Sequence, residues 1–256
     1  MKSLIAFSKK EATEWWRSGR FAILMVVFTL FGIMNPAFAK LTPWLMDSMS
    51  ESLENSGIIL GEIRVDAFTS WEQFYKNIPI AMIVFVLMIS GLFATEFQKG
   101  TLIPVLTKGL ARWKVYVAKT FGILLVWTVG YWTCFGITYV YNDIYWDNSV
   151  VAHPIAAAGL VYLFGLWLTA MVPLFSSFLN NAISVAMGTG SIVIASYALG
   201  IFPNIKSYVP TYLLSAQALL VRAGDPEDYL LVIVVTSILV VVSFVLGWVI
   251  YDRRSL

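Results

Sequence analysis

The amino-acid sequence predicts an all-α membrane protein with six transmembrane helices. Hydrophobic residues make up 59% of the 256 positions, and the mean hydropathy is +0.78; soluble domains are nearer ~45–50% apolar. Uncharged apolar runs long enough to cross a bilayer recur along the chain, and the alternating pattern of a membrane β-barrel is absent. We expect one transmembrane domain over residues 1–256, without a soluble domain large enough to fold by itself.

Residues 1–20 are expected to form an amphipathic helix on the membrane surface. The bases of this stretch fall within one arc of about 100°: Lys2, Lys9, Lys10, Arg17 and Arg20. Its apolar residues share a second arc: Leu4, Ile5, Ala12, Trp15 and Trp16. Phe7 does not fit this apolar arc. Because Trp with Lys and Arg is typical of the lipid headgroup boundary, five residues are expected at the membrane surface: Lys9, Lys10, Trp15, Trp16 and Arg17.

The six spans are expected at about 21–39, 78–95, 115–141, 154–178, 182–202 and 229–251. Asn35-Pro36 is expected to break the first span near its outer end, because proline lacks the backbone N–H. An alternative for this region is a signal peptide cleaved after Ala37-Phe38-Ala39. The long lead-in, which contains Glu11 and Glu14, disfavours that alternative.

Two polar segments lie between spans. Residues 40–77 are acidic and are expected to be a mostly solvated loop; shaping substrate exit or contacting a partner is the alternative. One short interfacial helix is expected there, suggested by four residues: Trp44, Leu45, Met49 and Leu53. Residues 203–228 are too short and too interrupted to span, so a re-entrant or interfacial element is expected.

The spans themselves offer little chemistry. The aromatic stripe of the third span predicts packing, as do the small residues of the fifth, for which lining a movable pathway is the alternative. His153 is the only histidine and Cys134 the only cysteine, so neither a metal site nor an intramolecular disulfide is expected. Nucleotide-binding and catalytic motifs are absent, and no catalytic site is expected on this chain.

The distribution of charge predicts the orientation. Most of the 17 Lys and Arg residues fall on the side that carries both ends of the chain, and most of the 15 acids fall on the other side. Since bases favour the cytoplasmic side, we expect a multi-pass protein of the cell membrane with both termini in the cytoplasm.

The stretch from Glu96 to Lys119 joins the second and third spans, and residues 96–114 form the loop. It holds one acid and five bases: Glu96, Lys99, Lys108, Arg112, Lys114 and Lys119. On charge alone this is an ordinary cytoplasmic loop. Glu96 closes a span, so its carboxylate needs water or a cationic partner. A bond to Lys99 and a contact with another subunit are the two options for that partner.

The order of residues in this stretch resembles the cytoplasmic loop of ABC-2 type permeases, the membrane subunits of ABC transporters. Residues 96–102, Glu-Phe-Gln-Lys-Gly-Thr-Leu, match the start of the family pattern, and Leu-Thr-Lys at 106–108 and Arg112 continue it. Gly109 and Ala111 stand where the family often has Pro and Ser. The resemblance implies that this segment docks on a separate ATPase subunit. It assigns that coupling to eight residues: Glu96, Lys99, Gly100, Thr101, Leu106, Lys108, Arg112 and Lys119.

The resemblance further implies an N-terminal elbow helix and the permease role in an ATP-driven exporter. The expected partners are two copies of the ATPase, which would bind ATP and Mg²⁺, a second permease copy, identical or homologous, and membrane lipid. No cofactor on this chain and no nucleic acid are expected. The cargo is expected to be amphipathic: a peptide, a lipid-like or a drug-like molecule.

Two other classes remain open. One is a structural membrane subunit without a transport role. The other is a channel or an ion carrier, which usually places ionisable residues near the middle of the membrane. The spans of this chain carry no Asp, Glu, Lys or Arg at that depth, which disfavours the ion carrier.

Overall fold

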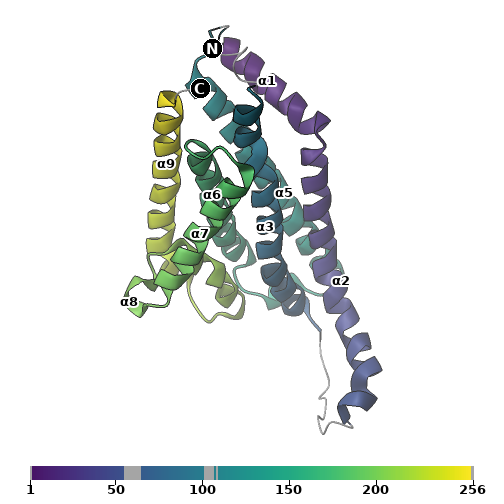
Figure 1. The fold of residues 1–256 in the computed structure, drawn as a ribbon. Coiled ribbons are helices and arrows are strands. Elements are labelled where there is room, and N and C mark those ends of the chain that lie inside the picture. Colours follow the sequence, from purple (N-terminus) through teal and green to yellow (C-terminus); the bar gives the residue numbers. More distant parts are fainter. Residues whose placement is uncertain (1, 55–64, 101–106, 108, 255–256) are drawn as a thin grey trace.

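The computed structural model describes residues 2–54, 65–100, 107 and 109–254. All regular structure among these residues is helical (Figure 1). The elements are α1 (Lys2–Arg17), α2 (Arg20–Glu54), α3 (Ala67–Lys99), α5 (Arg112–Tyr145), the 3₁₀ turn η1 (Asn148–Val150), α6 (Pro154–Ser176), α7 (Ala182–Gly200), α8 (Pro203–Lys206), η2 (Pro210–Val221), η3 (Pro226–Tyr229) and α9 (Leu230–Arg253).

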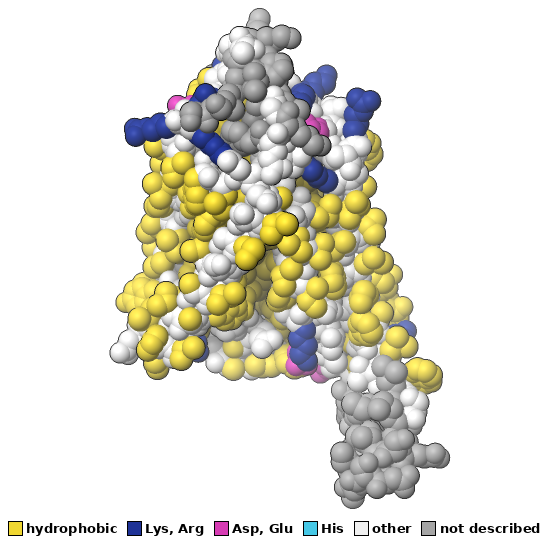
Figure 2. Space-filling model, in the orientation of Figure 1, with side chains coloured by type: hydrophobic (Ala, Val, Ile, Leu, Met, Phe, Trp, Pro, Cys, Tyr) yellow, Lys and Arg dark blue, Asp and Glu magenta, His cyan; other side chains and the backbone are white. Residues whose placement is uncertain are grey.

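Six of the described helices are long and apolar enough to cross a membrane: α2, α3, α5, α6, α7 and, together with η3, α9. This confirms the predicted class of an all-α polytopic membrane protein. Both ends of the chain and helix α1 lie at one end of the bundle, which we call the terminal end (Figure 1). Figure 2 shows a broad hydrophobic band around the middle, with most of the Lys and Arg side chains gathered at the terminal end.

Helix α2 does not break where proline predicted a break. It continues through Pro36 and Pro43 to Glu54, as proline is tolerated in membrane helices whose neighbours satisfy the freed backbone groups. Pro36 leaves the backbone carbonyl of Gly32 without its helical donor, and this carbonyl accepts from Thr138 Oγ1 on α5 (3.2 Å). The side chain of Asn35 donates to the same hydroxyl (3.0 Å).

The segment 40–77 is mostly helix, so the prediction of a largely solvated loop was wrong for its described part. Helix α3 begins at Ala67, and its first turns are buried: Ser70, Trp71 and Phe74 have no exposed surface. Trp44 lies on α2 itself rather than on a separate interfacial helix, while the side chains of three more residues assigned to that helix lie outside the described residues: Leu45, Met49 and Leu53.

The other four spans begin and end within a few residues of the prediction.

The element between α7 and α9 is a compact unit packed into the bundle at the opposite end from the termini. Helix η2 lies against α6, α7 and α9, and Leu213, Ala216 and Leu219 are fully buried. Ser196 Oγ on α7 lies 3.0 Å from Thr211 Oγ1. The backbone of the element between α7 and α9 is therefore covered by protein, which is the condition under which such segments are tolerated at membrane depth.

Aromatic side chains fill the centre of the bundle. The rings of Phe28, Phe85, Trp127 and Tyr131 lie 5.2–6.4 Å apart, centroid to centroid, and Tyr131 Oη donates to the carbonyl of Ala158 (2.7 Å). Helices α7 and α9 are peripheral, with most of their large apolar side chains exposed. These faces are suited to lipid or to another membrane helix.

Candidate functional site at the terminal end

One face of helix α1 packs against the bundle. Phe7, Glu11 and Trp15 follow one another at intervals of four, so they share this face, and all three are buried. The Trp15 ring lies on α5 where Gly122 leaves room: a Cβ at Gly122 would lie 2.9 Å from Trp15 Nε1. Trp16 is 71% exposed. The predicted arcs are thus corrected, because Phe7 and Trp15 face the bundle together and Trp16 does not.

A buried lysine joins three helices at this place. Lys119 Nζ on α5 lies 2.8 Å from Glu11 Oε2 on α1 and 3.0 Å from Glu96 Oε2 on α3. The exposed fractions are 1% for Lys119, 3% for Glu11 and 8% for Glu96. A charge with so little access to water needs opposite charges in contact with it, and these two carboxylates supply them.

Lys10 and Glu14 extend the arrangement toward the surface of α1. Lys10 Nζ lies 2.6 Å from Glu14 Oε2, 3.1 Å from Glu11 Oε1 and 3.4 Å from Glu96 Oε1. Burial lowers the pKa of Lys10, but the hydrogen bond to Glu14 and the charges of Glu11 and Glu96 outweigh it, so the pKa lies above its ordinary value. We call the five residues the ion cluster: Lys10, Glu11, Glu14, Glu96 and Lys119.

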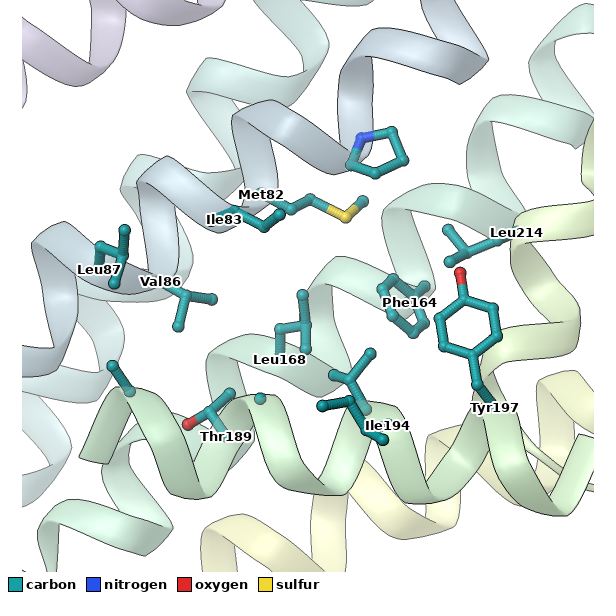
Figure 3. Close-up of a pocket in the computed structure, with 14 residues that line it drawn as sticks. Met82, Ile83, Val86, Leu87, Phe164, Leu168, Thr189, Ile194, Tyr197 and Leu214 are labelled. Carbon is teal, nitrogen blue, oxygen red and sulfur yellow. The ribbon is translucent and has the colours of Figure 1, made fainter. Parts of the chain in front are cut away.

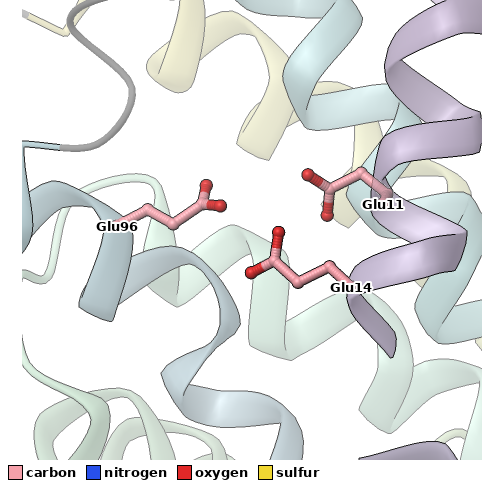
Figure 4. A group of neighbouring side chains, drawn as sticks. All are labelled: Glu11, Glu14 and Glu96. Carbon is pink, nitrogen blue, oxygen red and sulfur yellow. The ribbon is translucent and has the colours of Figure 1, made fainter. Parts of the chain in front are cut away.

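The carboxylates of the ion cluster converge on one point (Figure 4). One oxygen from each of Glu11, Glu14 and Glu96 lies within 4.8 Å of the others, a spacing that could hold a cation. The Lys10 ammonium lies within 3.4 Å of all three. The cation that these carboxylates contact is therefore a side chain of the chain itself.

An aromatic layer lies beside the ion cluster. Phe93, Tyr116 and Tyr251 bring together α3, α5 and α9, with ring centroids 5.5–5.8 Å apart. Just past α9, an Nη of Arg254 donates to the carbonyl of Ser176 at the last turn of α6 (2.9 Å), which satisfies a backbone acceptor that the helix leaves free. Together with α1, which the ion cluster joins to α3 and α5, five helices are in contact at the terminal end.

The residues assigned to ATPase coupling separate into two groups. Glu96 and Lys119 face inward in the ion cluster, and any contribution of the Lys119 side chain to a contact with another subunit would be indirect. Arg112 begins α5 and is half-buried, while Gly100 follows α3 in the left-handed region (φ 62°). Four other assignments lie outside the described residues: the side chain of Lys99, and Thr101, Leu106 and Lys108. The four exposed members of the membrane-surface set lie on α1: Lys9, Lys10, Trp16 and Arg17.

Sequence reasoning missed the partner of Glu96. It weighed Lys99, whose side chain lies outside the described residues, and another subunit. The structure shows contacts with Lys119 and Lys10, which sequence reasoning did not consider. A signal was present in α1, where Glu11 lies between Phe7 and Trp15 at four-residue intervals and so shares their inward face. The lone base inside the predicted third span, Lys119, was the matching signal.

A second feature lies within the membrane region. An apolar groove of about 400 Å³ runs between α3, α6 and α7 and ends at η2 (Figure 3). Val86, Leu168 and Ile194 are typical of its lining. Thr189 Oγ1 donates to the carbonyl of Val185 (2.9 Å), so its hydroxyl is already used. The groove is therefore suited to an aliphatic group and not to an ion.

Comparison with known proteins places the chain among membrane proteins and no further. No protein-family model matches the sequence. The chain is 21% identical over 238 residues to a protein of Bacillus subtilis (strain 168) named uncharacterized transmembrane protein YxlG, an alignment that covers 90% of this chain and 89% of that protein. Together with the six apolar helices, this identifies a membrane protein with several transmembrane helices.

Proposed function

We propose that the chain is the permease subunit of an ATP-driven exporter of the cell membrane, working with an ATPase on separate subunits. The observation that carries the proposal is the location of charge. The buried charged residues among those described are Glu11, Glu96 and Lys119, and all three lie at the terminal end, beside the connection between α3 and α5. A pump without charged residues at mid-membrane needs an energy source outside the membrane, and that connection offers a place to receive it.

The arrangement of helices supports the same reading. A surface helix precedes the first span, the stretch 96–119 with its five bases joins the second span to the third, and a compact element precedes the last. The first two features are those that the resemblance to ABC-2 permeases implies. The bases at the terminal end favour a cytoplasmic position for it, where a soluble ATPase could bind. Two ATPase copies and a second permease copy would complete the exporter.

The groove between α3, α6 and α7 supports an amphipathic cargo. Its lining is almost entirely aliphatic and aromatic, with Tyr197 contributing a phenol near the η2 end. A peptide, lipid-like or drug-like molecule could place its apolar part there. In the exporter, the cargo would leave along the seam between two permeases, which the exposed faces of peripheral helices would form.

Arg112 provides the test, because it is half-buried at the start of α5 and belongs to the proposed coupling set. The tagged chain is purified in mild detergent from cells that express it with its candidate ATPase, and co-purified protein and ATP hydrolysis are measured. We expect Arg112→Glu to leave the chain in the membrane while ATPase co-purification and ATP turnover are lost.

The matched control is Arg253→Glu, the same reversal at the same end of the bundle but on the exposed last turn of α9. It should retain both readouts. Equal behaviour of the two variants, whether both active or both inactive, would show that the connection between α3 and α5 has no special role in coupling.

A further inference from the structure

The contacts of helix α1 with the bundle differ in how strictly they fix its position. Phe7 and Trp15 make apolar contacts, which are non-directional, although the close fit of Trp15 over Gly122 also limits sliding. Lys119 holds Glu11 at 2.8 Å and Glu96 at 3.0 Å, and such charge-assisted contacts are lost over a short displacement. One turn of a helix is about 5.4 Å, so a slide of α1 by one turn would take Glu11 out of reach.

The burial of Lys119 makes such a slide unfavourable. With 1% of its surface exposed, the ammonium cannot exchange a lost carboxylate for water. Lys114 adds a second contact between the two helices, an exposed hydrogen bond in which its Nζ donates to Ser3 Oγ at the start of α1 (2.9 Å). Both contacts run from the first turns of α5 to α1, and Glu96 brings in the last turns of α3.

We propose that Lys119 is a positioning residue that fixes the register of α1 on the ends of α3 and α5, so that the three move as one unit. Within the proposed exporter, displacement of the ends of α3 and α5 by an ATPase would then carry α1 with it. This second statement rests on the proposed function, whereas the fixed register is a property of the chain alone.

The register is tested first on the purified chain, without any partner. Spin labels are placed at Ala12 on α1 and Gln98 on the last turn of α3, both exposed, in a Cys134→Ala background. The parent protein should give one narrow distance. Lys119→Met should broaden the distribution. The double variant Lys119→Met with Glu11→Leu should stay broad, because it removes the stranded Glu11 carboxylate without restoring the charged contact.

Glu14→Gln is the control within the ion cluster, because Glu14 contacts Lys10 and leaves the buried contacts of Lys119 unchanged. It should keep the narrow distance. If Lys119→Met does not fold, Glu11→Gln decides the question, since Lys119 then retains Glu96; it too should broaden the distance. A narrow distance in any of these neutral variants of Lys119 or Glu11 that folds overturns the proposal.

The role in coupling is tested on the ATPase complex. Addition of ATP should shift the Ala12–Gln98 labels together relative to a third label on α9, and Lys119→Met should retain the ATPase but lose the joint shift. A joint shift that survives Lys119→Met refutes the coupling role. Failure to obtain any ATPase complex would instead count against the proposed function, while the result on the isolated chain would still decide the register.

Discussion

Lys119 carries a charge at a position with almost no access to water, close to where α5 enters the membrane. Burying a charge of this kind is compensated only by close opposite charges and hydrogen bonds. Glu11 and Glu96 provide them at 2.8 and 3.0 Å. Removing one of these side chains leaves an opposite charge buried without its partner, which destabilises the fold. Removing a whole pair leaves fewer unpaired charges and costs less.

We therefore expect Lys119→Met to lower the free energy of unfolding by about 3–5 kcal/mol, the usual cost of breaking a buried pair. Combining it with Glu11→Leu should recover part of that loss, because the Glu11 carboxylate is then gone and Glu96 keeps its contact with Lys10. The measurement is denaturation of the detergent-solubilised protein.

Lys76→Met serves as the comparison. Lys76 also pairs with a glutamate, Glu72 at 3.0 Å, but both side chains are largely exposed, and exposed pairs contribute about 0–1 kcal/mol. If Lys119→Met lowered the free energy of unfolding no more than Lys76→Met does, the ion cluster would contribute no more to stability than an exposed ion pair.

Helices α5 and α6 show how close packing is achieved at the scale of elements. Trp127 on α5 lies directly over Gly165 on α6, where a Cβ would overlap the indole ring. Small residues at such positions let membrane helices approach closely. Gly159, on the same helix, has no atom within 4 Å of the position of a Cβ.

These two glycines make a matched pair. Gly165→Ala should destabilise the protein by about 1–3 kcal/mol, the usual cost of overpacking. Gly159→Ala should be neutral or slightly stabilising, because alanine is the better helix former. Thermal unfolding of both variants in one detergent gives the comparison, and equal midpoints would mean that the contact of α5 with α6 relaxes freely.

At the scale of the whole molecule, the charge asymmetry predicts the orientation in the membrane. The terminal end carries the ion cluster and most bases, and the positive-inside tendency places such an end in the cytoplasm. The opposite end displays the exposed acids Asp147 and Glu227.

Single cysteines report on this orientation in a Cys134→Ala background. A membrane-impermeant maleimide added to intact cells should modify cysteines at Asp147 and Glu227 and spare one at Gln98. All three are exposed, so differences in labelling report sidedness. Labelling of Gln98 in sealed cells would reverse the orientation and remove the cytoplasmic position on which the proposed function depends.

The class of the protein and the presence of its six spans follow from the hydropathy of the sequence. Length and hydropathy of a run are local properties, and the cost of exposing backbone polar groups to lipid forces each such run into a helix. The position at which a helix ends outside the hydrophobic band depends on contacts with other helices and not on local hydropathy alone. Helix α2 continues past Pro36 and α3 begins at Ala67 because each packs on the other.

Which charges meet depends on how the helices pack. Glu11 and Lys119 are separated by 108 positions, and their contact depends on the rotation of α1, on the small surface of Gly122 under Trp15 and on the depth at which α5 begins. Hydropathy reports none of these, because it averages over neighbours in sequence, whereas a salt bridge depends on a few ångströms of register between helices. The sequence located the charges of the terminal end, and the packing of α1, α3 and α5 brought them into contact.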